Sequence, residues 1–193
     1  MNICVYGAAS SLIDKSYIEA GKELGRRMVE RGHGLVFGGG AHGMMGAVAE
    51  GVYEKDGYIL GIIPAFFEEG GAEVSFKRCS EFIFTETMRE RKQLLMDKAS
   101  AIIMTPGGIG TYDEFFEVLT LKQLGRHNKA IVIYDINNYF KEMDYMMDKS
   151  IEKEFITQDC KDLYMMSNNI DEVLDYIENY DEKDIDLSKV KIR

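Results

Sequence analysis

The sequence predicts an α/β fold: a Rossmann-like, doubly wound parallel sheet with helices on both faces. Short apolar runs that are typical of buried strands alternate along the chain with amphipathic stretches of helical period. Such alternation produces right-handed βαβ units and a parallel sheet covered on both sides. Polar or glycine-containing loops follow three of the runs, at residues 7–11, 38–43 and 105–111. Because ligands of such sheets bind beyond the carboxyl ends of strands, these loops are candidate ligand contacts.

The apolar runs and the amphipathic stretches define the elements that we expect. The sequence predicts strands at residues 3–6, 34–37, 58–63, 81–85, 101–104, 130–134 and 162–165. It predicts helices at residues 16–30, 44–55, 88–98, 112–124, 139–149 and 169–180. We find no internal repeat, and expect one nucleotide-binding domain over residues 1–180. The charged segment 181–193 lacks helical periodicity and is expected to be a loosely ordered tail.

Composition narrows the classes of function. At 193 residues and 46% apolar content, the chain is long enough for one domain with a sizeable core. The formal net charge of −10 disfavours nonspecific binding to nucleic acid or to an anionic membrane, but it allows a local cationic pocket for a small anion. Signal-peptide and membrane-span patterns are absent, so we expect a cytoplasmic protein. The spacing of the three cysteines and three histidines favours neither disulfides nor a metal site, and we expect no cofactor.

The segment PGGIGTYDE, residues 106–114, is the most informative part of the chain. It connects an apolar run to an amphipathic stretch, so it forms the turn between a buried strand and a helix N-terminus. Its glycines let backbone N–H groups approach an anion, and the helix dipole favours negative charge there. Glu114 would then lie beside the bound anion. An alternative is a capping box, in which Thr111 caps the helix and Glu114 binds the N–H of the cap.

A second capped helix start lies at residues 87–92, TMRERK, with Thr87 as the cap and Glu90 as its partner. Three cations, Arg89, Arg91 and Lys92, crowd its first turns. Each opposes the helix dipole by about 0.3–1 kcal/mol, which favours a compensating anion close by. The alternative is that these side chains extend into solvent and pair with nearby carboxylates.

The glycine pattern of residues 38–43 also fits a dinucleotide-binding motif. It follows the second expected strand instead of the first, and no acidic residue ends the next strand, as an NAD-dependent oxidoreductase would require. We therefore interpret these glycines as part of a nucleotide pocket that also permits close packing of helix on strand.

Together, the PGGxGTxxE loop and the Met-x-x-Arg-Lys segment resemble the Lonely Guy (LOG) family of cytokinin riboside 5′-monophosphate phosphoribohydrolases. Further matches are GGGAHGMMG at residues 38–46 and QLG at residues 123–125, and the similarity extends over about residues 2–180. The resemblance implies hydrolysis of the N-glycosidic bond of AMP or an N6-modified AMP, with Arg91 and Glu114 as the catalytic pair. The expected substrate contacts are Ser10, Gly39, Gly40, Met88, Lys92, Gly107, Gly108, Ile109, Gly110, Thr111, Tyr112, Asp113 and Thr120.

The chain departs from the family pattern in two places. Residues 7–10 read Gly-Ala-Ala-Ser where plant-type members carry Gly-Ser-Ser, and Leu121 stands where many members have tryptophan. These changes leave open which base is accepted.

Lysine decarboxylase activity, which older descriptions give to such chains, is disfavoured. It requires a lysine that forms a Schiff base with pyridoxal phosphate, and the sequence around Lys92 and Lys98 offers no acidic partner for the pyridine nitrogen.

A noncatalytic nucleotide-binding or carrier protein with the same pocket remains the alternative, since fold and phosphate loop alone do not specify chemistry.

The helix expected at residues 112–124 carries apolar residues on nearly all of its faces. Packing on the sheet requires only one apolar face, so the helix has apolar surface left for another contact. Because members of the family are commonly dimers, we expect a homodimer.

Overall fold

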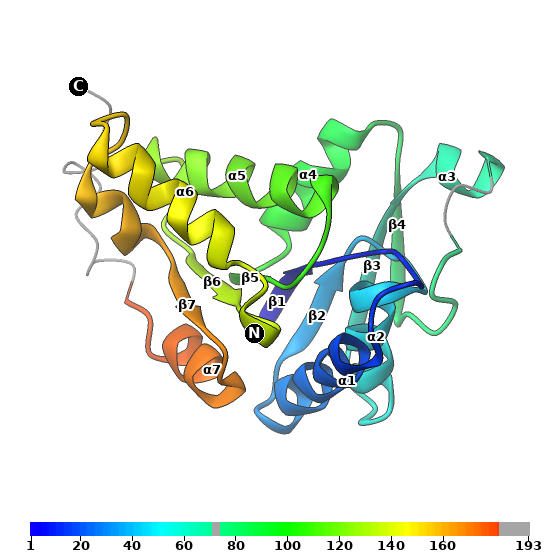
Figure 1. Ribbon diagram of the computed structural model, residues 1–193. Coiled ribbons are helices and arrows are strands. Elements are labelled where there is room, and N and C mark those ends of the chain that lie inside the picture. Colours follow the sequence, from blue (N-terminus) through cyan, green and yellow to red (C-terminus); the bar gives the residue numbers. More distant parts are fainter. Residues whose placement is uncertain (71–73, 182–193) are drawn as a thin grey trace.

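The structure is a computed structural model that describes residues 1–70 and 74–181. Strands and helices alternate along the chain, as the hydrophobic pattern predicts (Figure 1). The strands are β1 (Asn2–Tyr6), β2 (Gly34–Phe37), β3 (Ile59–Pro64), β4 (Glu81–Thr85), β5 (Ala101–Met104), β6 (Ala130–Tyr134) and β7 (Met165–Ser167). The helices are α1 (Lys15–Glu30), α2 (Gly43–Tyr53), α3 (Ala65–Gly70), α4 (Met88–Asp97), α5 (Ile109–Gln123), α6 (Lys141–Glu152) and α7 (Ile170–Glu178), with 3-10 turns η1 (Ile136–Asn138) and η2 (Gln158–Leu163).

The seven strands form one sheet in the order β4-β3-β2-β1-β5-β6-β7, and every pair is parallel. From β1 the chain first adds strands toward β4, then α4 carries it back so that β5 pairs with the other side of β1. The direction of winding therefore reverses between β1 and β5. In open parallel sheets this switch point leaves a crevice at the carboxyl ends of the two strands.

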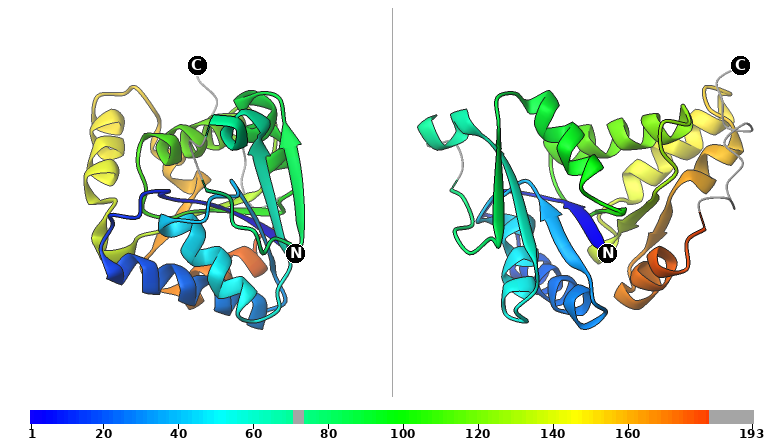
Figure 2. Two further views of the ribbon diagram at one scale, coloured as in Figure 1. Left: turned by 90° about the vertical axis from the view of Figure 1, so that its right-hand side faces the viewer. Right: turned by 180° about the vertical axis from the view of Figure 1, so that it is seen from behind.

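Helices cover both faces of the sheet (Figure 2). Each face has its own apolar core. Side chains of α1, α2 and α7, such as Leu24, Val48 and Leu174, pack on one face. Side chains of α4, α5 and α6, such as Leu95, Phe115 and Met143, pack on the other. Because neighbouring residues of a strand point to opposite faces, Ile3 and Cys4 of β1 join different cores. The predicted doubly wound fold class is confirmed.

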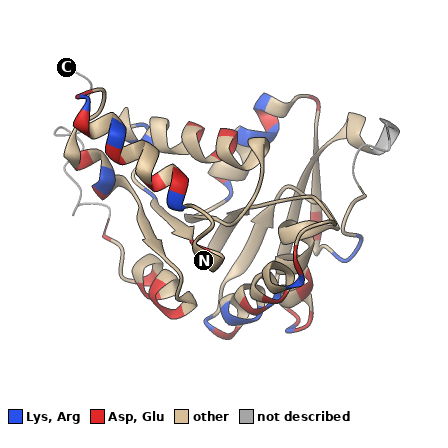
Figure 3. Cartoon of the chain, viewed as in Figure 1, with Lys and Arg blue, Asp and Glu red and all other residues tan. Residues whose placement is uncertain are grey.

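Charged residues gather on the helices and leave the centre of the sheet free of them (Figure 3). Among the strands that the structure describes, only β4, at one edge of the sheet, contains a charged residue, Glu81. None of the helices in the described ranges is long and apolar enough to cross a membrane.

The predicted elements differ from the observed ones mainly at loops. The last strand lies at Met165–Ser167 instead of residues 162–165, because the residues before it form the turn η2. The helix expected from residue 112 begins at Ile109, inside the glycine loop. Helix α3 follows β3 directly and was not predicted. Of the expected tail, residues 182–193 lie outside the described residues, so the proposed domain boundary stays a prediction.

Candidate active site

The loops after β1 and β5 are joined at the switch point of the sheet. The N–H of Ala8 donates to the carbonyl of Pro106 at 3.0 Å, and the Thr105 hydroxyl donates to the carbonyl of Tyr6 at 2.8 Å. The start of α2 joins them, since the N–H of Met45 donates to the carbonyl of Ala8 at 3.2 Å. Between these loops and α4 lies a cavity of about 360 Å³. Its lining residues are Gly7, Ala8, Ala9, Ser10, Met45, Phe67, Met88, Arg91, Gly108, Gly110, Thr111 and Glu114.

The N-terminus of α5 opens into this cavity. Its N-cap is Gly108, and among the described residues no side chain caps the helix. Helix geometry leaves the first N–H groups of α5 without partners inside the helix, and its dipole makes this end an anion site. A Cβ at Gly108 or Gly110 would meet none of the described atoms within 4 Å, so an anion can approach the backbone there.

The capping-box interpretation of Thr111 and Glu114 is wrong. Thr111 lies inside the first turn of α5 and is buried, and Gly108 takes the N-cap position. The side chain of Thr111 lies against Gly107, where an added Cβ would come within 2.1 Å of its hydroxyl. Thr111 therefore shapes the loop, while Glu114, one turn later, is available for another partner. The N-cap predicted for α4 is observed, because Thr87 accepts from the N–H of Glu90. The reciprocal half of the predicted capping box differs: the Glu90 carboxylate accepts from the N–H of Glu86, one residue before the cap.

Arg91 and Glu114 form a buried ion pair on the wall of the cavity. Nη1 of Arg91 lies 3.1 Å from Oε1 of Glu114, and only 6% and 11% of their side-chain surfaces are exposed. The guanidinium also donates from Nε to the carbonyl of Ile62 at 3.2 Å and from Nη2 to the carbonyl of Gly38 at 3.4 Å. A buried charge is stable only when it is paired and hydrogen-bonded, and Arg91 meets both conditions. Its head group is consequently fixed from three sides.

Gly38 makes room for this guanidinium. A Cβ at Gly38 would lie 1.9 Å from Nη2 of Arg91, closer than any real contact. The neighbouring Gly39 has φ +80, and its Cβ would meet the Ile63 side chain at 2.2 Å. Gly38 thus makes room for Arg91 and Gly39 for Ile63, so both glycines permit close packing in this segment.

Burial raises the pKa of Glu114 to about 7, well above its usual range. The positive charge of Arg91 opposes this rise, the charge of Asp113 adds to it, and Lys92 opposes it. Burial also raises the pKa of the nearby Tyr6 hydroxyl and Cys4 thiol, which stay neutral. Near neutral pH the carboxyl of Glu114 can therefore both accept and release a proton, as a general base or acid requires.

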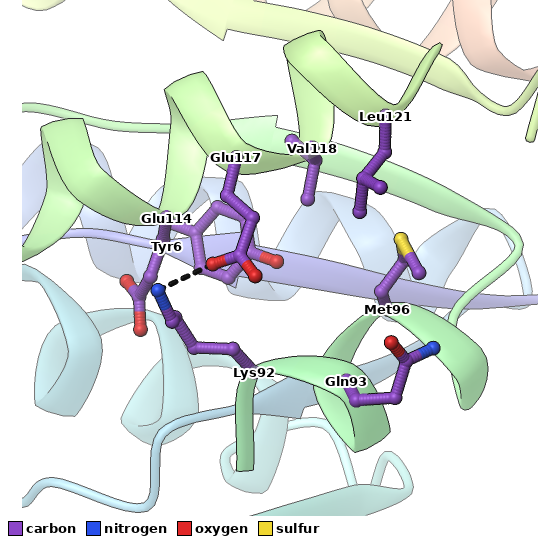
Figure 4. Close-up of a pocket in the computed structure, with 8 residues that line it drawn as sticks. All are labelled: Tyr6, Lys92, Gln93, Met96, Glu114, Glu117, Val118 and Leu121. Carbon is purple, nitrogen blue, oxygen red and sulfur yellow. Dashed lines mark ion pairs between the residues drawn. The ribbon is translucent and has the colours of Figure 1, made fainter. Parts of the chain in front are cut away.

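Two of the cations at the start of α4 form ion pairs with carboxylates of α5. Lys92 pairs with Asp113 at 3.1 Å and also with Glu117, both on α5. In Figure 4, Lys92 points from α4 toward α5, and Glu117 points toward it. Arg91 pairs with Glu114, so two of the three predicted anion-seeking cations are neutralised by α5. Arg89 is exposed.

The predicted site residues fall into three groups: those that line the cavity, those in the same turn that do not, and those elsewhere in the chain. Arg91, Glu114, Gly108, Gly110, Thr111, Met88 and Ser10 line it. Gly107, Ile109, Tyr112 and Asp113 belong to the same turn but face other ways: the Tyr139 hydroxyl donates to Gly107, Ile109 is 90% exposed, and Tyr112 packs against the Phe140 ring.

Four further predicted contacts lie outside the turn 106–114 and are also not among the described residues that line the cavity: Lys92, Gly39, Gly40 and Thr120. Gly40 forms an isolated bridge with Ser75, and Thr120 lies in a groove between α5 and α6. Their roles as substrate contacts stay predictions.

Two lining residues were not predicted: Met45 and Phe67 add an aromatic ring and a thioether to the cavity. Gly7, Ala8 and Ala9 also line it, and they belong to the loop at residues 7–11 that the sequence predicts as a candidate ligand contact. Phe67 had no signal in the sequence, because it lies on α3, whose six residues are too few to show a helical period. Within the described ranges, no group of three or more His, Cys, Asp or Glu side chains is placed to hold a metal ion.

Known proteins resemble this chain in sequence and in fold. A family model described as "Possible lysine decarboxylase" matches residues 45–177. The cytokinin riboside 5′-monophosphate phosphoribohydrolase LOG2 of Arabidopsis thaliana is 32% identical over 178 residues, which cover 92% of this chain and 83% of that protein. The probable cytokinin riboside 5′-monophosphate phosphoribohydrolase LOG4 of Oryza sativa subsp. japonica is 34% identical over 173 residues, which cover 89% and 74%.

Among solved structures, the molybdenum cofactor binding protein from the phototrophic bacterium Rippkaea orientalis matches with a TM-score of 0.69. That match covers 92% of this chain and 94% of that one at 17% sequence identity, and so shows the shared fold alone. The family model and the two plant relatives go further than the fold: the chain belongs to the Lonely Guy (LOG) family, the family of the cytokinin riboside 5′-monophosphate phosphoribohydrolases.

Proposed function

We propose that this protein hydrolyses the N-glycosidic bond of a nucleoside 5′-monophosphate, releasing the free base and ribose 5-phosphate. One observation carries the proposal: the Arg91–Glu114 ion pair lines the same cavity as the uncapped N-terminus of α5. An anion site and a carboxyl that titrates near neutrality are the two elements that this reaction needs. The names of the plant relatives support the same reaction class.

The phosphate binds at the start of α5, on backbone N–H groups near Gly108 and Gly110. Glu114 faces the ribose and stabilises the positive charge that develops at the anomeric carbon. When the bond from this carbon to the base breaks, its electron pair leaves with the base, which takes up a proton from solvent. The oxygen of a water molecule bonds to the carbon, and one proton of that water passes to Glu114, which then releases it to solvent. Arg91 keeps the Glu114 carboxyl oriented.

The base lies on the apolar part of the cavity, against Met45, Phe67 and Met88. An aromatic ring and two flexible thioether side chains accept a planar base without selecting its hydrogen-bonding groups. AMP and N6-modified AMP, including a cytokinin ribotide, are therefore the first substrates to test. We expect the enzyme to act in the cytoplasm.

Chromatography of reactions with a panel of nucleoside monophosphates tests the proposal. Wild-type protein should release base from at least one of them, and Glu114→Ala and Arg91→Ala should each lose turnover by about a hundredfold or more while staying folded. Calorimetric binding of AMP with no base released over hours would instead identify a noncatalytic nucleotide-binding or carrier protein. Full activity in either variant would reject the assigned roles.

The groove between α5 and α6 supports assembly as a homodimer. It has a volume of about 270 Å³, and its lining is mostly apolar: Phe116, Leu119, Met146, Met147, Ile156 and Leu163 contribute to it. Helix α5 packs one face on the sheet, while Leu124, the C-cap residue of this helix, is 51% exposed. A second copy that packs on this groove would bury the surface that its own subunit leaves open.

A further inference from the structure

The ammonium group of Lys92 lies on the side of Glu114 that faces away from the substrate cavity. It does not belong to the lining of the 360 Å³ cavity; instead it lines a second, water-sized cavity of about 10 Å³ together with Tyr6, Glu114 and Glu117 (Figure 4). Glu114 lines both cavities. The carboxyl of Glu114 therefore stands between the expected substrate and Lys92.

Lys92 is also held by carboxylates. Its Nζ lies 3.1 Å from Oδ2 of Asp113 and forms a second ion pair with Glu117, so it joins α4 to the second and third turns of α5. A phosphate at Lys92 would have to displace these partners and would lie among the carboxyls of Asp113, Glu114 and Glu117. The uncapped start of α5 offers an anion site without such repulsion.

We propose that Lys92 is a positioning residue that keeps Glu114 available as a carboxylate by neutralising the acidic side chains beside it, and that it does not bind the substrate phosphate. The inference rests on the proposed function and deepens it, since it assigns a role at the same site.

The charged groups around Glu114 explain why the loss of Lys92 would change the protonation of Glu114. Helix α4 presents Arg91 and Lys92, α5 presents Asp113 and Glu117, and β1 presents the neutral Tyr6 and Cys4. Removing Lys92 takes away one cation and leaves Asp113 and Glu117 unneutralised. Both changes favour the protonated form of Glu114, and so raise its pKa. Removing the charge of Asp113 acts in the opposite direction.

Three variants and one control test the assignment. Lys92→Met removes the charge, Lys92→Arg restores it, and Asp113→Asn removes an opposing charge from a side chain that is 58% exposed, so that folding is spared. Lys98→Met removes an exposed lysine from the end of the same helix and is the matched control. Titration by ¹³C NMR follows the Glu114 carboxyl, whose signal is identified by its absence in Glu114→Gln. This readout does not depend on turnover.

We expect Lys92→Met to raise the pKa of Glu114, Asp113→Asn to lower it, and Lys92→Arg and Lys98→Met to leave it near that of the wild type. The acidic limb of the pH profile of kcat should shift in the same direction as the pKa of Glu114. In Lys92→Met, kcat at pH 7 should fall by about three- to tenfold, because a smaller fraction of Glu114 is then in the carboxylate form.

Binding of AMP distinguishes positioning from phosphate contact. In a Glu114→Gln background, which does not consume AMP, Lys92→Met should leave the Kd nearly unchanged. Loss of a direct charge-assisted contact would instead weaken binding by about tenfold or more, and that result would overturn the proposal. An unmoved Glu114 titration in Lys92→Met and Asp113→Asn would overturn it too. If the wild type releases no base from any nucleoside monophosphate, the proposed function fails, whereas the NMR titration still reports on Lys92.

Discussion

At the scale of single residues, the site depends on a compromise at Glu114. Burial favours the neutral acid, while the guanidinium of Arg91, 3.1 Å away, favours the carboxylate, and burial is the larger effect. The surroundings of the Glu114 carboxyl thus disfavour its charged form. Active sites commonly give up stability in this way to hold a reactive group in place.

We predict that Glu114→Gln stabilises the protein, and that the gain grows with pH. In the unfolded chain the carboxyl titrates near 4.5, whereas in the folded protein its pKa is about 7. Between these values the folded state binds more protons than the unfolded state, so wild-type stability falls as pH rises through this window. The expected gain is small at pH 4 and about 1–3 kcal/mol at pH 8. Urea unfolding of both proteins from pH 4 to pH 8 measures the difference; a gain that is constant over this range would contradict the assigned pKa.

A second prediction concerns Gly38→Ala. The added methyl group would lie 1.9 Å from Nη2 of Arg91 and 3.3 Å from the Met45 sulfur, so the guanidinium must move. Overpacking of this kind costs about 1–3 kcal/mol. We expect a lower melting temperature and a loss of turnover similar to that of Arg91→Ala. Thermal unfolding and base release measure both effects, and wild-type values for both would show that Gly38 has no part in placing Arg91.

At the scale of elements, hydrophobic periodicity predicted six of the seven strands to within one residue at each end, because central strands such as Ala101–Met104 are bounded by polar or turn residues. The remaining errors have physical causes. Helix α5 was expected to begin at residue 112, with a Thr111 cap as one of two interpretations, but the helix begins at Ile109 and Gly108 is its N-cap, a position that glycine also occupies readily. The pairing of Arg91 with Glu114 was expected, whereas its carbonyl partners at Gly38 and Ile62 were not, since backbone contacts between distant strands leave no pattern in the sequence.

The start of α5 yields a third prediction, for Gly110→Ala. Gly110 is in the first turn of the helix, and a Cβ there meets none of the described atoms within 4 Å. Alanine should therefore stabilise the fold by up to about 1 kcal/mol, because it is a better helix former than glycine. The same methyl group would occupy the approach to the backbone N–H groups, and should weaken AMP binding by about tenfold or more.

Thermal unfolding and calorimetry in the Glu114→Gln background separate these two effects of Gly110→Ala. Gly38→Ala is the matched glycine substitution, which should lower the melting temperature. An unchanged affinity for AMP in Gly110→Ala would place the phosphate away from the start of α5.

At the scale of the whole molecule, the order of the strands creates the site. Because winding reverses between β1 and β5, their loops meet at the carboxyl edge of the sheet, and α4 and α5 lie side by side on one face. Arg91 and Glu114, 23 residues apart in the chain, are brought together by this packing. The same face carries the groove between α5 and α6, so assembly through the groove would place a second copy on the helix that bears the site.

The last prediction tests that assembly with Met146→Glu. Met146 lines the groove and is 46% exposed, so a glutamate there is tolerated in a monomer but becomes an unpaired charge once a second copy covers it. An unpaired buried charge costs about 3 kcal/mol, and the dissociation constant of the dimer should rise about a hundredfold. Tyr145→Glu is the matched control, because Tyr145 is 62% exposed on the same helix and does not line the groove. Sedimentation velocity over a range of concentrations measures the effect. A wild-type protein that is monomeric throughout, or a Met146→Glu dimer as tight as that of Tyr145→Glu, would show that this groove is not the interface.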